Sequence, residues 1–475
     1  MTEQISPNVA LDSAAPLNTN VVLDPTTPLN TAYDLIERKY TFKEARTLYY
    51  HSDEFLEWTG THYKLIEANT MREVIYHFMD GADCPAGNGT TMPFKATKKR
   101  VNDVVDALMA ATNLRSSFQP PCWLLPGKPS IAPTEIIACK NGLLHIPTRK
   151  LLPHTPVFFT RTALPYRHDP RASQPTEWFK FLDSLWGSDT AAKDTLQEML
   201  GYLLTSETSQ QKIFALIGPT RSGKGVIART MTKLLGSDNV AGPTLASLQT
   251  NFGLAPLIGK QAAIVADARL GGRADQQAIA ERLLSISGED VITIDRKYRE
   301  PWTGRLPARF FILSNELPGL ADASGALAKR FIVLVLTRSF YGREDHGLES
   351  RLEAEMPSIL NWVLDGRDRL SQRGYFVQPP SSAEVVQELE DLGSPISAFL
   401  RECCDIGEGW SVDIENLYSA WQRWCIRNGR DRPGTTATFG RYLRAALPVM
   451  KVSQPRDGSK GRKRVRLGLR LKQSE

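Results

Sequence analysis

The sequence lacks the long apolar run that a membrane-spanning helix requires. Across 475 residues, no segment approaches the roughly 18 to 20 uninterrupted apolar residues of such a helix, which argues against a membrane protein. The first residues, MTEQISPNVALDS, contain no basic stretch followed by an apolar one, so no secretion signal is visible. We therefore expect a protein of the cytoplasm.

The six cysteines form no recognisable metal-binding or disulfide pattern. None belongs to a CxxC pair or to a set with an HxxxH partner, so neither a metal ribbon nor a disulfide framework is predicted. We expect reduced, mostly buried thiols. The residues concerned are Cys84, Cys122, Cys139, Cys403, Cys404 and Cys425.

Positive charge is concentrated at one end of the chain. The net charge is +6, but residues 421–475 contain 15 Lys and Arg against 3 Asp and Glu, a net of +12, which leaves about −6 for residues 1–420. A basic end favours a polyanionic partner, because neutralised phosphates release counterions and this release supplies most non-specific affinity for nucleic acids. A solvated, disordered basic tail is the alternative.

Residues 1–31 contain a near-repeat, VALDSAAPLNT followed by VVLDPTTPLNT, without a helical or strand period. Such a segment buries too little apolar surface to offset the entropy lost on ordering. We interpret it as a flexible leader, with a short partner-binding motif as the alternative.

Residues 32–207 have a mixed pattern. FLEWTGTHYKLIE predicts a hairpin across Thr59-Gly60, and IIACKNGLLHI predicts a turn at Asn141-Gly142. Helices are predicted for MREVIYHFMD, TKKRVNDVVDALMAAT, TEWFKFLDSLWG and AAKDTLQEMLGYLLT. Because no acid pair or metal cluster stands out here, we expect a scaffolding or oligomerising role.

The most informative stretch is KIFALIGPTRSGKGVIART, residues 212–230. It predicts a buried strand at 213–217, a glycine-rich turn at 218–225 and then a helix, the layout of a phosphate-binding loop. Unpaired backbone N–H groups at the helix start would cradle a polyphosphate, and Lys224 would add a mobile positive charge. The predicted nucleotide-binding residues are Gly218, Pro219, Thr220, Arg221, Ser222, Gly223, Lys224 and Gly225.

This loop departs from the usual pattern at one position. Gly225 stands where Ser or Thr usually holds Mg²⁺, so another oxygen or a water would have to bind the metal. A plain Gly/Ser turn between a strand and a helix is the alternative interpretation.

Two polar residues follow later apolar strands. Strands and helices alternate over residues 211–340, which predicts an α/β core with a largely parallel sheet. Asp267 closes the apolar run at 262–266, where a carboxylate can hold Mg²⁺, although strands often end in Asp. Asn315 lies just past the run at 310–313, where an amide can position the attacking water.

Two basic segments are further candidates. Arg330 ends a short predicted helix; in a ring it could reach a neighbouring subunit's nucleotide, or it could simply meet the helix dipole. Arg296, Lys297 and Arg299 cluster near a predicted hairpin tip, which could grip a phosphate backbone or be a solvated turn.

The C-terminal end predicts two helices and a basic hairpin. VDIENLYSAWQRWCIRNG and TATFGRYLRAAL have helical stripes, the second with Arg441 and Arg444 on its polar face. A hairpin around Asp457-Gly458 should have Arg464, Arg466 and Arg470 on one cationic face of its second strand. This outline is typical of a winged helix, with a cap for subunit contacts as the alternative. The predicted DNA-binding residues are Arg296, Lys297, Arg441, Arg444, Lys460, Arg462, Lys463 and Arg464.

Taken in order, GPTRSGKG, IVADARL, TIDRKY, FILSNELPGL and SGALAKRFI resemble the motifs of superfamily 3 helicases. The sequence is similar to the helicase portion of phage and plasmid primase–helicases related to the poxvirus nucleoside triphosphatase/primase. NGLLHIPTRKLLPHTP through LQEMLGYLLT looks like the domain that precedes the ATPase in that family. LESRLEAEMPSILNWVLDGRDRL looks like the helical lid that follows it, so the resemblance covers about residues 32–475.

The resemblance implies a ring, expected to be a hexamer, that hydrolyses ATP and moves on DNA from 3′ to 5′. Ala268 stands where many relatives have a second acid. No N-terminal primase domain is visible, so primer synthesis is expected to belong to another chain. The roles carried over are phosphate contact for Lys224, Mg²⁺ binding for Asp267, sensing for Asn315, DNA contact in the channel for Lys297 and action in trans for Arg330.

The predicted fold class is α/β, with a P-loop, AAA+-like ATPase core, a mixed N-terminal domain and a C-terminal winged helix. We expect an ATP- and Mg²⁺-dependent replicative helicase of a phage, plasmid or integrated mobile element in a bacterial host, binding single- and double-stranded DNA. The alternatives are an ATPase that loads or remodels replication proteins and an origin-binding protein in which nucleotide is only a switch. The predicted domains are a leader at 1–31, a mixed α/β domain at 32–207, the ATPase core at 208–340, a helical lid at 341–392 and the winged helix at 393–475.

Overall fold

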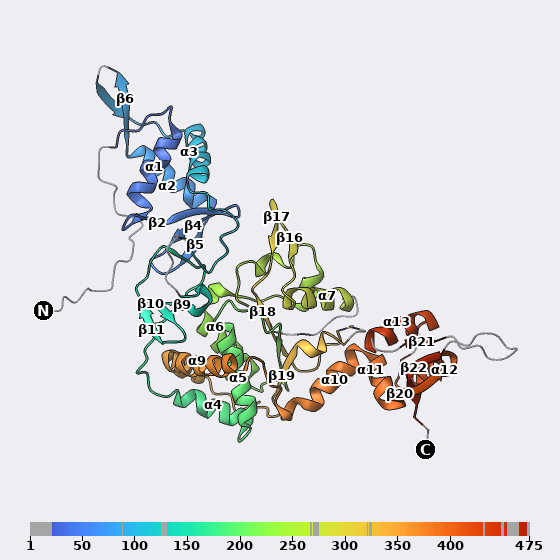
Figure 1. Cartoon of the computed structure of the whole chain (residues 1–475). Helices are drawn as coiled ribbons and strands as arrows, with labels where there is room; N and C mark the ends of the chain where they lie inside the picture. Colours follow the sequence, from blue (N-terminus) through green and yellow to red (C-terminus); the bar gives the residue numbers. More distant parts are fainter. Residues whose placement is uncertain are drawn as a thin grey trace.

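The computed structural model describes residues 21–472, apart from 88, 125–130, 267, 269–274, 321, 323–324, 431–432, 448–450 and 454–464. Three units follow one another along the chain (Figure 1). An N-terminal unit (residues 21–114) and a C-terminal unit (residues 394–472) lie at two ends of the molecule, with a larger central unit between them.

The N-terminal unit packs three helices with a small antiparallel sheet. The predicted hairpin at Thr59-Gly60 is confirmed: it joins β4 to β5, and Gly60 has a φ of +94°. The helices are α1 (Pro28–Lys39), α2 (Ala68–Asp80) and α3 (Lys98–Ala111), and the sheet order is β3 (Leu48–His51), β4 (Glu54–Trp58), β5 (Tyr63–Ile66). Two short hairpins complete the unit, β1 (Thr41–Phe42) with β2 (Ala45–Arg46) and β6 (Asp83–Gly87) with β7 (Thr90–Pro93).

The predicted leader ends earlier than residue 31. Residues 1–20 lie outside the described residues, but Val21 and Leu23 are buried in the N-terminal core. The Leu23 N–H donates to the Asp83 carbonyl oxygen, and the Asp83 N–H donates to the Val21 carbonyl oxygen, each at 2.8 Å. The second copy of the near-repeat is therefore part of the fold, because its two apolar residues align beside β6 and its PLNT opens α1.

Short strands connect the N-terminal unit to the main sheet. The predicted turn at Asn141-Gly142 is confirmed, since it joins β9 to β10. The strands are β8 (Cys122–Trp123), β9 (Ile136–Cys139), β10 (Gly142–His145), β11 (Lys150–Leu152) and β12 (Phe158–Phe159). They form a three-stranded and a two-stranded antiparallel sheet.

The central unit is built on a five-stranded, fully parallel sheet, as the alternating pattern predicts. Its order is β14 (Val240–Ala241), β15 (Ala262–Val265), β18 (Arg309–Ser314), β13 (Ile213–Ile217), β19 (Phe331–Val335). Successive residues of each long strand enter two different cores, as Phe214 and Ala215 do, because strand side chains alternate between faces. The sheet is therefore buried on both sides, which explains its continuous apolar strands.

The helices on the first face come from three separate parts of the sequence. They are α4 (Thr176–Trp186), α5 (Thr190–Leu203), α6 (Lys224–Leu235), α8 (Leu348–Ala354) and α9 (Met356–Arg373). The second face packs against α7 (Gln276–Ser287), the hairpin β16 (Ile292–Arg296) with β17 (Arg299–Gly304), and α10 (Ala383–Gly393). Because α4, α5, α8 and α9 share one core with the sheet, the predicted domain boundaries at 207 and 341 do not separate independent units.

The C-terminal unit has the predicted helices and hairpin strands. The helical stripes of the two predicted helices form its core, in which Leu417, Trp421, Trp424, Phe439 and Leu443 are buried. The elements are α11 (Pro395–Cys403), β20 (Cys404–Asp413), α12 (Ile414–Arg427), α13 (Thr436–Ala446), β21 (Lys451–Ser453) and β22 (Val465–Leu471), and the sheet order is β20-β22-β21, antiparallel. The predicted turn at Asp457-Gly458 lies outside the described residues.

One prediction about this unit is wrong. Arg466 is not on an exposed cationic face: it is buried, with its guanidinium beside Gly440 of α13. Strict alternation fails because Gly468 has a φ of +88° and the pairing of β20 with β22 shifts register opposite it.

Among all the described residues, no helix is both long and apolar enough to cross a bilayer.

Candidate functional site

The strand, loop and helix at residues 213–235 form as the sequence predicts. β13 is buried throughout, and α6 begins at Lys224. Gly218 is required because a Cβ there would lie 2.4 Å from the Leu336 carbonyl oxygen. Gly223 has a φ of +94°, a left-handed conformation that glycine adopts without strain. These two positions explain why the loop needs glycine at each end.

The loop leaves a run of backbone N–H groups without acceptors. The segment after β19 holds the loop from its carbonyl side: the Phe340 N–H donates to the Arg221 carbonyl and Ser339 Oγ donates to that of Thr220, both at 2.9 Å. Among the described residues, the N–H groups of residues 220–225 have no hydrogen-bond acceptor. Unpaired amides at the positive end of a helix dipole form an anion-binding site.

Lys224 and Asn315 lie side by side at the carboxyl edge of the sheet. Lys224 Nζ donates to Asn315 Oδ1 at 3.0 Å and to the carbonyls of Gly218 and Pro219 at 2.7 and 2.8 Å. Asn315 reaches this place because β18 is the neighbour of β13, so both strands end at the same edge. Partial burial lowers the pKa of Lys224, since desolvation disfavours the ammonium form. An anion beside the ammonium would offset that desolvation.

Asp267 itself lies outside the described residues. The strand that precedes it, β15, pairs with β18 so that Val265 is opposite Ile312. The end of β15 therefore lies at the same sheet edge as Asn315, one strand further from Lys224.

Arg330 lies at the opposite edge of the sheet. Phe331, which follows it, pairs with Ile213 at the start of β13, so a whole strand of about 16 Å separates Arg330 from the loop. Arg330 Nη1 donates to the Leu284 carbonyl at 3.1 Å and to Ser287 Oγ at 2.9 Å. Within one chain it is thus a cation at the C-terminus of α7, a different helix from the short one that the sequence predicts to end at Arg330.

The predicted basic hairpin forms, but two of its three basic side chains have partners. Arg296 Nη2 donates to Asp53 Oδ2 at 3.0 Å, and Arg299 Nη1 donates to Glu54 Oε1 at 2.9 Å. These carboxylates lie at the turn between β3 and β4, so the hairpin is tied to the N-terminal unit. Lys297 stays exposed at the tip beside Tyr298, whose surface is 92% exposed.

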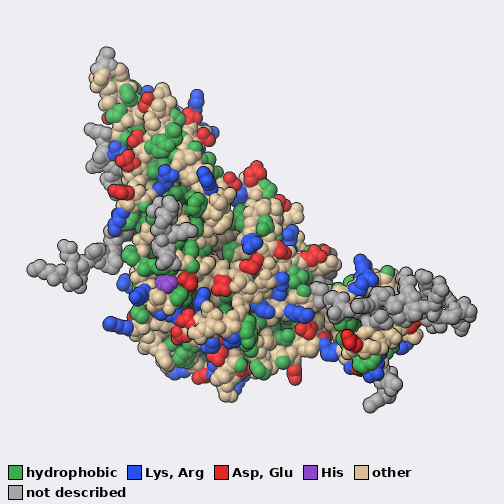
Figure 2. Space-filling view, in the orientation of Figure 1, with side chains coloured by type: hydrophobic (Ala, Val, Ile, Leu, Met, Phe, Trp, Pro, Cys, Tyr) green, Lys and Arg blue, Asp and Glu red, His purple; other side chains and the backbone are tan. Residues whose placement is uncertain are grey.

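The C-terminal unit exposes Arg441 and Arg444 on one side of α13, as predicted. The predicted residues Lys460, Arg462, Lys463 and Arg464 lie outside the described residues. Figure 2 shows basic and acidic side chains interspersed over the central unit on the face drawn. Binding of a polyanion would therefore depend on particular segments.

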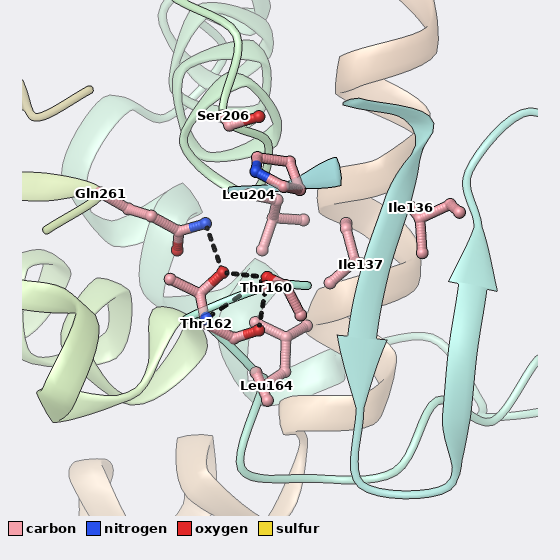
Figure 3. A pocket seen from close by; sticks show the side chains of 10 residues that line it. Ile136, Ile137, Thr160, Thr162, Leu164, Leu204, Ser206 and Gln261 are labelled. Carbon is pink, nitrogen blue, oxygen red and sulfur yellow. Dashed lines mark hydrogen bonds between the residues drawn. The ribbon is translucent and has the colours of Figure 1, made fainter. Parts of the chain in front are cut away.

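A small internal cavity is a poor candidate for a ligand site. It has a volume of about 20 Å³ and lies between the β9 region and the start of β15 (Figure 3). Gln261 Nε2 donates to Thr162 Oγ1 at 3.4 Å, while the buried Gln261 Oε1 has no partner within the described part of the chain. Its size fits one water bound by the Thr, Ser and Gln side chains among its otherwise apolar lining, and it is far too small for a nucleotide.

Two family models match separate parts of the chain. Residues 35–187 match the family described as D5 N terminal like, and residues 216–330 match a family of unknown function (DUF5906). The second segment contains the residues predicted to take part in catalysis, Lys224, Asp267, Asn315 and Arg330. An uncharacterized mitochondrial protein of Marchantia polymorpha, ymf21, is 28% identical over 130 residues, which is 25% of this chain and 72% of that protein.

Solved structures share the fold over most of the chain. The apo structure of the NrS-1 C-terminal region covers 93% of this chain and 99% of its own, with a TM-score of 0.55 and 12% identity. A second apo structure of that region, the A form, covers 93% and 100%, with a TM-score of 0.51 and 12% identity. The match at residues 35–187 supports the predicted relation to phage primase–helicases; membership of superfamily 3 stays a prediction.

Sequence reasoning missed the segment that supports the loop. Residues 336–344 follow β19 and supply the contacts to residues 218–221, but their sequence has no motif that would indicate this role. It also missed Arg229, whose guanidinium lies beside Gly225.

Proposed function

We propose that this protein is an ATP-hydrolysing DNA helicase of superfamily 3, with a P-loop, AAA+-like core, that serves replication of a phage, plasmid or integrated element in a bacterial cytoplasm. The observation that carries the proposal is the group of unpaired amides at residues 220–225 beside Lys224 and Asn315. These are the parts that phosphoryl transfer needs: a cradle, a cation and a polar group near the reacting phosphate.

Each polar residue has a proposed task. Lys224 contacts the β- and γ-phosphates, and Asn315 positions the attacking water. Mg²⁺ would neutralise phosphate charge, and we propose that Asp267 holds it. Thr220 and Ser222 of the described loop have only neutral hydroxyl groups, and Gly225 has no hydroxyl at all.

The position of Arg330 supports a ring, for which we propose six subunits. Arg330 lies a full strand away from its own loop, so only another copy could bring it to the nucleotide. An arginine supplied in this way stabilises the charge of the transition state.

Two segments are proposed to bind DNA. The tip of β16–β17, with Lys297, would contact a single strand moving 3′ to 5′ through the ring. The C-terminal unit would act as a winged helix on origin duplex, with α13 as reader through Arg441 and Arg444 and with β21 and β22 as the wing strands. Lys460, Arg462, Lys463 and Arg464, which lie between these strands in the sequence, are proposed to contact the same DNA. A primase on another chain is a proposed partner.

Strand displacement tests this function. The purified chain, with ATP and Mg²⁺, should separate a forked duplex that carries a 3′ single-stranded tail, and a 5′-tailed fork should be a poor substrate. ATP turnover without displacement would favour an ATPase that remodels other replication proteins. Tight ATP binding with negligible turnover, even with single-stranded DNA, would favour an origin-binding protein in which nucleotide is only a switch. The missing hydroxyl at Gly225 is the feature that favours this alternative.

Lys297→Ala should weaken single-strand binding and unwinding while basal ATP turnover persists. Loss of one phosphate contact should reduce the slope of log K against log salt by about 0.7. Lys64→Ala is the matched control, because Lys64 is also an exposed lysine but is paired with Asp238 and lies outside the hairpin. Equal effects of the two substitutions on the salt slope, measured by fluorescence anisotropy, would contradict a specific role for Lys297.

A further inference from the structure

Gly225 has no backbone reason to be glycine. It is the second residue of α6, and its φ is outside the left-handed region that favours glycine. Glycine is also a weak helix former, so this position sacrifices helix propensity. Outside the helix backbone, the three described atoms nearest to a Cβ there all belong to Arg229: Nη1 at 3.0 Å, Cζ at 3.8 Å and Nη2 at 3.9 Å. The guanidinium of Arg229 therefore fills the space beside the missing side chain.

Arg229 is held in this position from outside the loop. It lies one turn after Gly225, and helical side chains lean toward the helix N-terminus, which brings the guanidinium over the first turn of α6. Its Nε donates to Glu349 of α8. Within the described residues, neither Nη group has a hydrogen-bond acceptor, so two donor groups remain available beside the unpaired amides.

We infer that Arg229 is a phosphate-binding residue of the nucleotide site and that Gly225 is present to admit its guanidinium. A planar guanidinium matches a phosphate with two parallel donors, which a lysine does not. In the usual loop a hydroxyl next to the lysine binds Mg²⁺. Here the guanidinium of Arg229, bound to Glu349, occupies the space beside that position. This inference rests on the proposed function, because it requires a polyphosphate at the loop.

The chain offers a matched control. Lys233 and Glu353 form a second ion pair between α6 and α8, at 2.6 Å, one turn further along both helices. Lys233→Ala removes a similar tie between the helices but lies farther from the N-terminus of α6. If Arg229 only tied α6 to α8, Arg229→Ala and Lys233→Ala should have the same effect on nucleotide binding.

Calorimetric titration of the full chain with ATP, ADP and AMP tests the inference. Arg229→Ala should weaken ATP and ADP binding by about 10- to 100-fold, the effect of losing a hydrogen bond to a charged group, and should change AMP binding little. Lys233→Ala should change all three by less than about twofold. Arg229→Lys keeps the charge and should lose affinity only partly, which preserves the test if the alanine variant does not fold.

A double-mutant cycle tests the link to Gly225. Gly225→Ala should push the guanidinium away by a few tenths of an ångström and weaken ADP binding by less than Arg229→Ala does, and in the double variant it should add nothing to the loss caused by Arg229→Ala. Additive losses, or an Arg229→Ala variant that binds ADP like the unmodified chain, would overturn the inference alone. An unmodified chain with no affinity for ATP would overturn the proposed function, and this inference with it.

Discussion

Lys224→Ala should reduce ATP turnover by about 10²- to 10³-fold, the usual effect of removing one group that stabilises developing charge. The ammonium is positioned by Asn315 and by the loop carbonyls, and its loss would remove the positive charge held at that place beside the phosphates. Duplex binding should persist, because α13 and the rest of the C-terminal unit lie at one end of the molecule, apart from α6 and the loop (Figure 1). Steady-state phosphate release and duplex anisotropy measure the two activities.

Lys233→Ala is the control for this substitution, since it removes a lysine of the same helix that pairs with Glu353. It should leave turnover within about twofold, as expected for an exposed ion pair. Loss of turnover and duplex binding together in Lys224→Ala would show that DNA binds near the loop and not at the C-terminal unit.

Arg330→Ala should abolish turnover and spare nucleotide binding. The reason is its place at the sheet edge opposite the loop, a full strand away from its own nucleotide site, so that in the proposed ring it would act on the nucleotide of a neighbouring subunit. Mixing this variant with Lys224→Ala should restore some turnover, because an intact loop can then meet an intact arginine. Phosphate release measured across mixing ratios tests this expectation.

The competing role of Arg330 has its own signature. As a cation at the C-terminus of α7, it should contribute about 1 kcal/mol to folding stability. Ser287→Ala removes one of its partners and is the structural control. Equal losses of turnover in both variants, with equal shifts in denaturant midpoint, would assign Arg330 to helix capping. If the mixture regains no turnover, the result counts against action between subunits only when native mass spectrometry shows that the two variants have exchanged subunits.

The loop itself was predictable because its requirements are local. Five consecutive apolar residues predict a buried strand, and Gly223 marks a left-handed turn that the loop's own geometry demands, whereas the need for glycine at 218 comes from Leu336, far along the chain. The position of Asn315 was half predictable: parallel strands end at one edge, but only the fold decides that β18 lies next to β13. Arg466 was mispredicted because Gly468 interrupts an alternation that the sequence pattern implies.

The sequence by itself determined the order of elements, the phosphate-type loop and the basic character of the C-terminal end, since each depends on neighbours within a few residues. Tertiary structure alone decided which strands adjoin, that α4, α5, α8 and α9 share a core with the sheet, and that Arg296 and Arg299 are paired with Asp53 and Glu54. It also placed Arg229 over Gly225. The physical reason is that these contacts join residues far apart in the chain or depend on side-chain packing, which composition and periodicity do not encode.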